Sequence, residues 1–299
     1  MQELCVQGLV KVYGGRHGEK RALGGVSFTL GPGFYGLLGP NGAGKTTTIR
    51  QLMGFVRPDS GSARIFGKDC FTQAARVQRQ VGYLPGELAL MDDMTGMAFI
   101  RLMAGLRGQR DLSHALQLCA RFGLDANQKI RKMSKGTKQK VGLVCALMHR
   151  PRLLILDEPT SGLDPLLQNQ LWEILLAEKQ QGVTILLSSH IFEEVERLCD
   201  RAALLRSGRV AAVEQLGELR TKASRVYQLR FETAARAAVF AEGWPGAAAK
   251  GEWVQLRLGR GEPVARLLAQ AAQSGVQDLQ TRQENLEDMF LRMYGGQDK

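Results

Sequence analysis

Short apolar runs alternate with helical stretches through much of the chain. Phe34–Leu38, Leu153–Leu156 and Val183–Leu187 are such runs, and their length and continuity are typical of strands buried on both faces of a parallel sheet. Thr46–Met53 and Leu166–Gln180 have helical character. This alternation predicts an α/β fold whose parallel sheet is covered by helices on both faces.

Two other parts of the first 130 residues do not follow this alternation. Leu4 to Leu38 contains short strand-like runs broken by glycine, and Ala63–Phe66 is a further predicted strand. Glu87 to Gln128 is predicted to be mostly helical, with one buried face at the spacing i, i+3, i+4, i+7. That face consists of Phe99, Leu102, Met103 and Leu106. A methionine cluster in this segment (Met91, Met94, Met97 and Met103) either fills the core or offers an adaptable surface to a partner helix.

After Leu216 the chain takes on a different character. Tyr227, Leu229 and Phe231 alternate with polar residues, as do Val254, Leu256 and Leu258, which predicts half-buried strands. Helices are predicted at Ala234–Glu242, Pro263–Gln273 and Asn285–Tyr294. We therefore expect a domain at 1–216, with a helical subdomain at about 87–150, and a separate α+β domain at 217–299.

Composition and charge limit the classes of protein to which the chain can belong. Apolar residues make up 44% and charged residues 23% of the 299 residues, which is ordinary for a globular protein and argues against disorder. The net charge of +11 favours anionic partners: nucleotide, nucleic acid or acidic lipid. The five cysteines are scattered without a CxxC pair, as expected of reduced thiols. We expect no secretory signal and no membrane span, since no apolar run approaches about 20 residues.

A phosphate-binding loop follows the predicted strand Phe34–Leu38. The segment fits G-x-x-x-x-G-K-[ST] and consists of Gly39, Pro40, Asn41, Gly42, Ala43, Gly44, Lys45 and Thr46. Its glycines allow backbone N–H groups to surround a phosphate, Lys45 neutralises phosphate charge, and the Thr46 hydroxyl can hold Mg²⁺. A chance glycine-rich turn is the alternative, but the strand before it and the helix after it argue against that. Thr47 is counted with the nucleotide-binding residues.

Two carboxylates end the apolar strand at Leu153–Leu156. Asp157 is expected to hold the magnesium, and Glu158 to polarise a water for in-line attack on the γ-phosphate. Paired acids at a strand end can also be a simple helix cap. Their occurrence together with the phosphate loop favours the catalytic interpretation.

These motifs and three others resemble those of the ATP-binding subunit of an ABC transporter. Met133–Lys140 resembles the family signature LSGGQ, Ser161–Asp164 matches the D-loop, His190 the switch histidine, and Tyr13 the aromatic that stacks on adenine. The resemblance covers about Leu4 to Leu216. It implies a P-loop ABC-type fold, ATP and Mg²⁺ as cofactors, and ATP hydrolysis. A strand-end packing role is the alternative for Tyr13.

The resemblance also implies partners. Ser134 and Gly136 would form an anion site at a helix N-terminus, which is used if two copies meet head to tail and each signature closes on the ATP held by the other. His190 would bind the γ-phosphate, and Asp164 would link the two sites. Integral membrane permease subunits would supply the transport pathway, with this chain peripheral at the cytoplasmic face. The motifs look most like the drug, antibiotic or ion exporter branch.

The chain departs from the family pattern in two motifs. Gly86 stands where the Q-loop normally has glutamine, so Glu87 is the nearest candidate to replace it. Lys135 replaces the first glycine of the signature, and Thr137 and Lys138 stand where glycine and glutamine usually begin to close it. The change at Gly86 does not affect nucleotide binding. Gly86 would instead affect the outer coordination shell of the metal and the coupling of hydrolysis to the membrane subunit.

The motifs and the charge pattern also allow two other functions. A soluble ABC-type ATPase acting on nucleic acid or ribosomes is the main alternative, although such relatives usually carry two cassettes or long coiled-coil insertions. A nucleotide-gated clamp without turnover is a third. The basic stretch Lys129–Arg152 fits a solvated face or pairing with ATP across a dimer better than contact with lipid or nucleic acid. Glu193, Glu194 and Glu196 are expected to complement a helix dipole.

Overall fold

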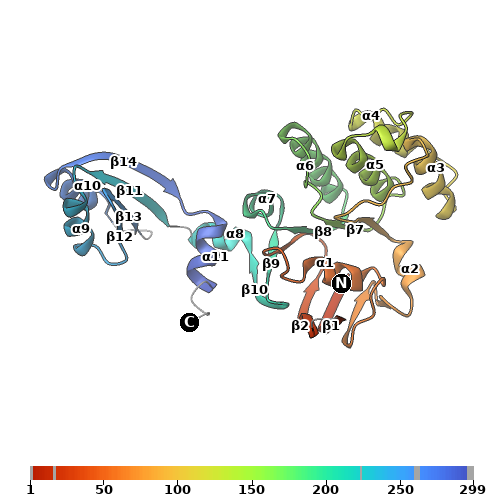
Figure 1. Cartoon of the computed structure of the whole chain (residues 1–299), viewed down its shortest axis with the longest axis horizontal. Helices are drawn as coiled ribbons and strands as arrows, with labels where there is room; N and C mark the ends of the chain where they lie inside the picture. The colour runs from red at the N-terminus through yellow and green to blue at the C-terminus, as the bar shows by residue number, and fades with distance from the viewer. Residues whose placement is uncertain (1–2, 16–17, 223, 259–262, 295–299) are drawn as a thin grey trace. The chain divides into compact units, whose positions relative to one another are not determined.

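The computed structural model describes residues 3–15, 18–222, 224–258 and 263–294 (Figure 1). The chain divides into two compact units, Met1–Leu216 and Gly217–Lys299. The first unit contains a six-stranded sheet and a four-stranded sheet, and the second unit contains another four-stranded sheet.

The six-stranded sheet has the strand order β10-β9-β3-β8-β7-β6 and forms the core of the first unit. Its strands are β3 (Phe34–Leu38), β6 (Val81–Leu84), β7 (Leu153–Asp157), β8 (Thr184–Ser189), β9 (Arg201–Arg206) and β10 (Arg209–Gln215). All neighbours are parallel except β9 and β10. Every residue of β3, β7 and β8 is buried, as continuous apolar runs require.

The other sheet of this unit has the order β2-β1-β4-β5 and is antiparallel. Its strands are β1 (Leu4–Gly15), β2 (Gly18–Leu30), β4 (Ser60–Ile65) and β5 (Lys68–Asp69). The expected short runs are instead two long strands of 12 and 13 residues. Glycines do not break them because register shifts absorb the irregular backbone: one shift falls between Val6 and Leu9, around Gly8 at φ 60°.

Helices connect the strands of the first unit. They are α1 (Lys45–Leu52), α2 (Ala74–Gln78), α3 (Gly96–Leu106), α4 (Ser113–Arg121), α5 (Lys135–Leu147), α6 (Pro165–Gln180) and α7 (Phe192–Leu198), with a 3-10 turn at Ile130–Lys132. Both α3 and α4 pack against α5 (Figure 1). The helical segment was expected to begin at Glu87, but its first helix begins only after Thr95. The Thr95 side chain caps this helix by accepting a hydrogen bond from the Ala98 amide.

The buried face of α3 differs from the expected one. Phe99 is buried, but Leu106 is 75% exposed. Gly96, Ile100 and Ala104 are buried together with Phe99, whereas Leu102 and Met103 are only half-buried, so the buried face of α3 is turned away from Leu106. Of the methionines, Met91 is 55% exposed, while Met94, Met97 and Met103 are half-buried.

The second unit is an antiparallel sheet in the order β12-β13-β11-β14. Its elements are β11 (Arg225–Phe231), α9 (Ala234–Glu242), β12 (Ala248–Lys250), β13 (Trp253–Leu258), α10 (Val264–Gln273), β14 (Val276–Gln283) and α11 (Leu286–Tyr294), preceded by α8 (Leu216–Lys222). Tyr227, Leu229 and Phe231 of β11 share one core with Phe240 of α9 and Leu267 of α10. The alternating strand residues are buried because the helices cover their face.

Candidate nucleotide site

The loop between β3 and α1 has a backbone that its glycines make possible. Gly44 has φ 107°, and a Cβ there would lie 2.6 Å from Leu23 Cδ2 and 2.9 Å from the Ala22 carbonyl, so a side chain is excluded. Gly44 is also the N-cap of α1, where no side chain caps the helix and the first turn has no acidic residue. The first amides of α1 are therefore open to an anion.

Lys45 lies in the centre of this loop. Its side-chain Nζ donates a hydrogen bond to the Gly39 carbonyl at 2.6 Å and lies 3.4 Å from Glu158 Oε1. The residue is only 5% exposed. A buried cation needs a compensating charge, and Glu158 supplies it in this structure.

Asp157 ends β7 and is 1% exposed. The Ser188 hydroxyl of the neighbouring strand β8 donates to Asp157 Oδ1, whereas Asp157 Oδ2 is buried with no hydrogen-bond partner among the described residues. Thr46 and Asp157 both line one cavity. An orphaned carboxylate oxygen and a threonine hydroxyl are oxygen ligands that suit Mg²⁺, so these two residues fit the expected metal.

Glu158 is held in a strained position at the end of β7. Its φ is 48°, a left-handed conformation that is uncommon outside glycine. The Glu158 amide donates to the Ser188 hydroxyl at 3.0 Å, and its carboxylate lies 3.3 Å from His190 Nδ1. The strain therefore places this carboxylate between Lys45 and His190.

A cavity of about 370 Å³ brings the phosphate loop and the two acids together. It is lined by Asn41, Thr46, Arg50, Tyr83, Pro85, Gly86, Glu87, Lys135, Asp157, Glu158 and Ser161. A Cβ at Gly86 would lie 3.5 Å from Asp157 Oδ2, so the missing Q-loop side chain leaves space beside the metal-binding candidate. Glu87 is exposed and lines the same cavity.

The predicted site residues of the signature, the D-loop and the adenine contact are not among those that line this cavity. Ser134 is the N-cap of α5, and its hydroxyl accepts a hydrogen bond from the Thr137 amide at 3.2 Å. Gly136 lies in the first turn of that helix. Asp164 caps α6 through the Leu167 amide at 2.9 Å. Tyr13 is 39% exposed on β1, with Lys11 Nζ 5.5 Å from its ring centroid.

Sequence reasoning missed the contacts of Lys135 and the burial of Glu194, which does lie in the first turn of α7 as expected. Lys135 Nζ lies 3.4 Å from Ser161 Oγ, so the residue that replaces a signature glycine reaches the D-loop of its own chain. Glu194 is 2% exposed and accepts from the Ser189 hydroxyl at 2.6 Å. Burial raises the pKa of the Glu194 carboxyl. Glu194 therefore fixes the residue before His190, a role that dipole patterning could not indicate.

A G-x-x-x-x-G-K-T loop between a buried strand and a helix, with two carboxylates at the end of a nearby strand, is typical of P-loop nucleotide-binding proteins. Residues 23–161 match the family described as "ABC transporter". The chain is 40% identical over 235 residues to the daunorubicin/doxorubicin resistance ATP-binding protein DrrA of Streptomyces peucetius. The matched region covers 76% of this chain and 70% of DrrA. It is 36% identical over 299 residues to the Nod factor export ATP-binding protein I of Burkholderia pseudomallei (strain 1710b), or 94% of each chain.

The solved structures agree with this match. A structure described as that of an ATP binding subunit of an ABC transporter is 34% identical, with a TM-score of 0.66, and covers 73% of this chain and 92% of that one. The chain belongs to the ATP-binding proteins of the ABC transporter family. The predicted ABC-type P-loop fold and ATPase class are thereby confirmed. Within the described residues, none of the helices has the length and apolar character needed to span a bilayer.

Proposed function

We propose that this chain drives export by separate membrane subunits, through a dimer that closes on ATP at the cytoplasmic face of the membrane. Its support includes the resistance and export functions in the names of the relatives. The observation that carries it is the incomplete signature at the site: Lys135 lines the cavity of its own chain, whereas Ser134 and Gly136 do not. A second copy would bring its signature helix to that cavity.

Each residue of the site has a role in this proposal. Gly39–Thr47 would hold the phosphates, Tyr13 would stack on adenine, and Asp164 would link the two sites of the dimer. Thr46 and Asp157 would hold Mg²⁺, which neutralises phosphate charge when bound.

Binding of ATP would change the partners of the charged groups. In this structure Glu158 Oε1 lies 3.4 Å from Lys45 Nζ and 3.3 Å from His190 Nδ1. A γ-phosphate would compete with Glu158 for Lys45 and His190, because it carries more negative charge than a carboxylate. The Glu158 carboxylate would then be released to accept a proton from the attacking water.

Changing Gly136 to aspartate tests the signature without disturbing the fold. The nearest atoms to a Cβ at Gly136 lie 3.8 Å away and its φ is not positive, so a side chain fits there. We expect Gly136→Asp to keep the ATP affinity of the single chain and to lower hydrolysis by at least about 30-fold, because like charges across an interface cost several kcal/mol. Phosphate release and fluorescent-nucleotide binding measure the two effects.

Gly136→Asn is the matched control for this change. It adds a side chain of nearly the same size without the negative charge, so it should retain more activity than Gly136→Asp. If Gly136→Asp hydrolyses ATP as fast as the parent chain, the signature does not meet a nucleotide and the dimer proposal is wrong.

An exposed aromatic side chain, Phe55, contacts a residue that lines the nucleotide cavity. Phe55 is 56% exposed, and its ring centroid lies 5.6 Å from that of Tyr83. Tyr83 lines the cavity beside Gly86, and burial raises the pKa of its hydroxyl to about 12, so it stays neutral. Exposed aromatics are frequent anchors of protein interfaces. We propose that Phe55 contacts the permease.

We therefore expect Phe55→Asp to reduce retention of the chain on washed membranes of its source cells by at least about tenfold, the loss typical of an interface anchor. Immunoblotting of the membrane fraction measures this. Phe55→Leu should behave like the parent chain, and ATP binding by purified Phe55→Asp should persist. Equal retention of Phe55→Asp and the parent would rule out this contact.

A further inference from the structure

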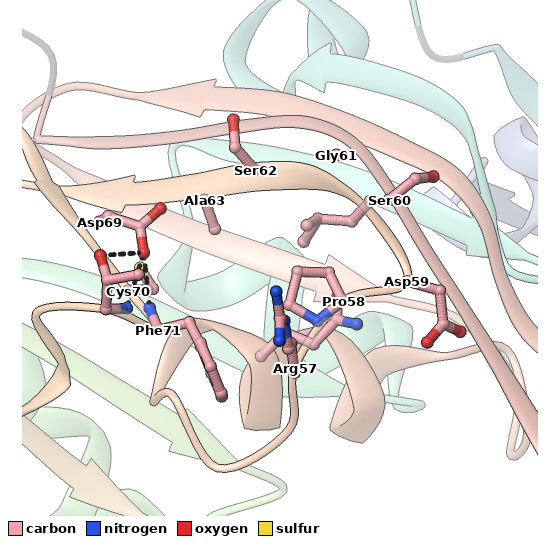
Figure 2. Close-up of a pocket in the computed structure, with 13 residues that line it drawn as sticks. Arg57, Pro58, Asp59, Ser60, Gly61, Ser62, Ala63, Asp69, Cys70 and Phe71 are labelled. Atoms are coloured by element: carbon pink, nitrogen blue, oxygen red, sulfur yellow. Dashed lines mark hydrogen bonds between the residues drawn. The ribbon is translucent and has the colours of Figure 1, made fainter.

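Two cavities of the first unit have no lining residue in common with the nucleotide cavity. One of them lies beside β4 and has a volume of about 280 Å³ (Figure 2). Its two carboxylates are already engaged. Asp69 accepts from the Phe71 amide at 3.1 Å, and Asp59 accepts from Lys11 Nζ at 2.8 Å. These acids therefore do not call for a bound cation.

The other cavity is basic. Its volume is about 470 Å³, within the roughly 300–1,000 Å³ range of small-molecule sites. Three arginines line it: Arg79 follows α2, Arg107 follows α3, and Arg150 lies just beyond α5. Asp111 is the only acid among the described residues of this lining. With histidines counted as neutral, three guanidiniums and one carboxylate give this basic cavity a charge of +2.

Arg107 lines the basic cavity with a half-buried side chain. Its guanidinium donates to the Gln78 carbonyl at 3.0 Å and to the Val81 carbonyl at 3.4 Å. It also lies 3.0 Å from His149 Nε2, which accepts the bond because arginine has no acceptor, so the ring is neutral. In agreement, burial and the nearby Arg107 charge lower the pKa of His149 to about 4.

These partners orient the Arg107 guanidinium without neutralising it. All three acceptors are uncharged, and no carboxylate pairs with Arg107 among the described residues. Burial lowers the pKa of the guanidinium, because a cation that leaves water loses hydration. A half-buried cation of this kind is stabilised by an anion that enters the cavity.

Asp111 does not supply that anion to the three arginines. Its carboxylate accepts from both the amide and the hydroxyl of Ser113, each at 2.8 Å, at the start of α4. These two bonds, with a smaller contribution from the Arg150 charge, hold the pKa of Asp111 below its usual range. Asp111 is therefore ionised and occupied at the helix start, and it offsets only one of the three positive charges.

The backbone of Arg150 is unusual for its residue type. Its φ is 52°, a left-handed conformation that glycine commonly provides just after a helix. The side chain is exposed and belongs to the basic stretch Lys129–Arg152. Arginine therefore replaces the residue that would make this turn most easily, and it adds a cation to the cavity.

The helix dipoles are the alternative reason for this basic lining. Each of the three arginines lies just beyond the C-terminal end of a helix, where a positive charge is favourable. This effect accounts for the sign of the charge at each helix end. It does not account for the meeting of all three at one cavity of ligand size.

We propose that the basic cavity binds a small molecule that carries a dianionic phosphate group, as a phosphomonoester does. Guanidinium groups match phosphate oxygens in two-bond pairs, which makes arginine the preferred residue for phosphate recognition. A phosphomonoester carries a charge of about −1.5 to −2 at pH 7, which balances the charge of the lining. A phosphodiester, as in nucleic acid, has one charge for each phosphate and matches it less well.

Nuclear magnetic resonance of the full chain with glycerol 3-phosphate tests this site. ADP and Mg²⁺ are present to fill the phosphate loop, and NaCl keeps the ionic strength constant. We expect the backbone amides of Gln109 and Ser113 and the side-chain Nε of Arg107 to shift, with a Kd of about 1 mM for so small a ligand. Glycerol should cause no shift, and dimethyl phosphate, a diester, should bind at least about tenfold more weakly.

Three variants separate a site from general attraction to a basic protein. Arg79→Gln and Arg150→Gly should each weaken binding by at least about tenfold, for one lost charge-assisted hydrogen bond. Arg150→Gly also removes the backbone strain, so this variant should remain folded. Arg110→Gln is the matched control, because it removes the same charge from an exposed residue of the adjoining loop that does not line the cavity.

The proposal is supported if Arg110→Gln binds glycerol 3-phosphate as the parent chain does while the other two variants bind it weakly. It is overturned if glycerol 3-phosphate causes no shift, which is the result expected when the arginines serve the helix dipoles alone. Equal affinity for dimethyl phosphate, or equal weakening by Arg110→Gln and Arg79→Gln, would also overturn it.

Discussion

Glu158→Gln is expected to bind ATP normally and to hydrolyse it about 10²- to 10⁴-fold more slowly, the usual contribution of a general base. The Ser188 hydroxyl holds the backbone of Glu158 at 3.0 Å, and that contact does not involve its side chain. Glutamine therefore keeps the position and size of the side chain but cannot take a proton from water. Single-turnover phosphate release measures the loss.

The exposed acid Glu87 is the matched control for this variant, because it lines the same cavity as Glu158. Glu87→Gln should retain most of the activity. If instead Glu87→Gln is the slow variant and Glu158→Gln turns over at the parent rate, the assignment of the general base is wrong.

Lys45→Ala is expected to weaken ATP binding by at least about 30-fold, the lower end of the cost of removing one partner from a buried charged pair. Lys45 is 5% exposed, and its ammonium lies between the Gly39 carbonyl and Glu158. Alanine leaves no positive charge at this position to neutralise the phosphates. Isothermal titration with ATP measures the change.

Lys135→Ala provides the comparison for the lysine variant. Lys135 also lines the cavity, but its Nζ lies near Ser161 and remains partly exposed. We expect it to alter the affinity of the single chain much less. Equal ATP affinity for Lys45→Ala and the parent would contradict the phosphate-loop assignment.

The parts of the site that depend on local sequence could be predicted. The glycine spacing before Lys45 and the apolar run before Asp157 specify a loop and a strand end through backbone geometry alone. Parallel pairing of β3 and β7 with β8 then brings both to one edge of the sheet. The mutual position of Lys45 and Glu158 follows from that topology.

Features that depend on tertiary neighbours could not be predicted. Spacing on α3 indicates an apolar face but not which part of it meets α5, so Leu106 was expected to be buried and is exposed. Glu194 looks like a surface acid in the sequence and is buried beside Ser189. Likewise, the arginines of the basic cavity are far apart in the sequence, and only the fold brings them together.

The mass in solution of the Glu158→Gln variant tests the central claim most directly. Light scattering of the purified chain with ATP and Mg²⁺ should give twice the monomer mass, and the same sample with ADP should give the monomer mass. A monomer under both conditions, at concentrations where ATP occupies the phosphate loop, would contradict the account.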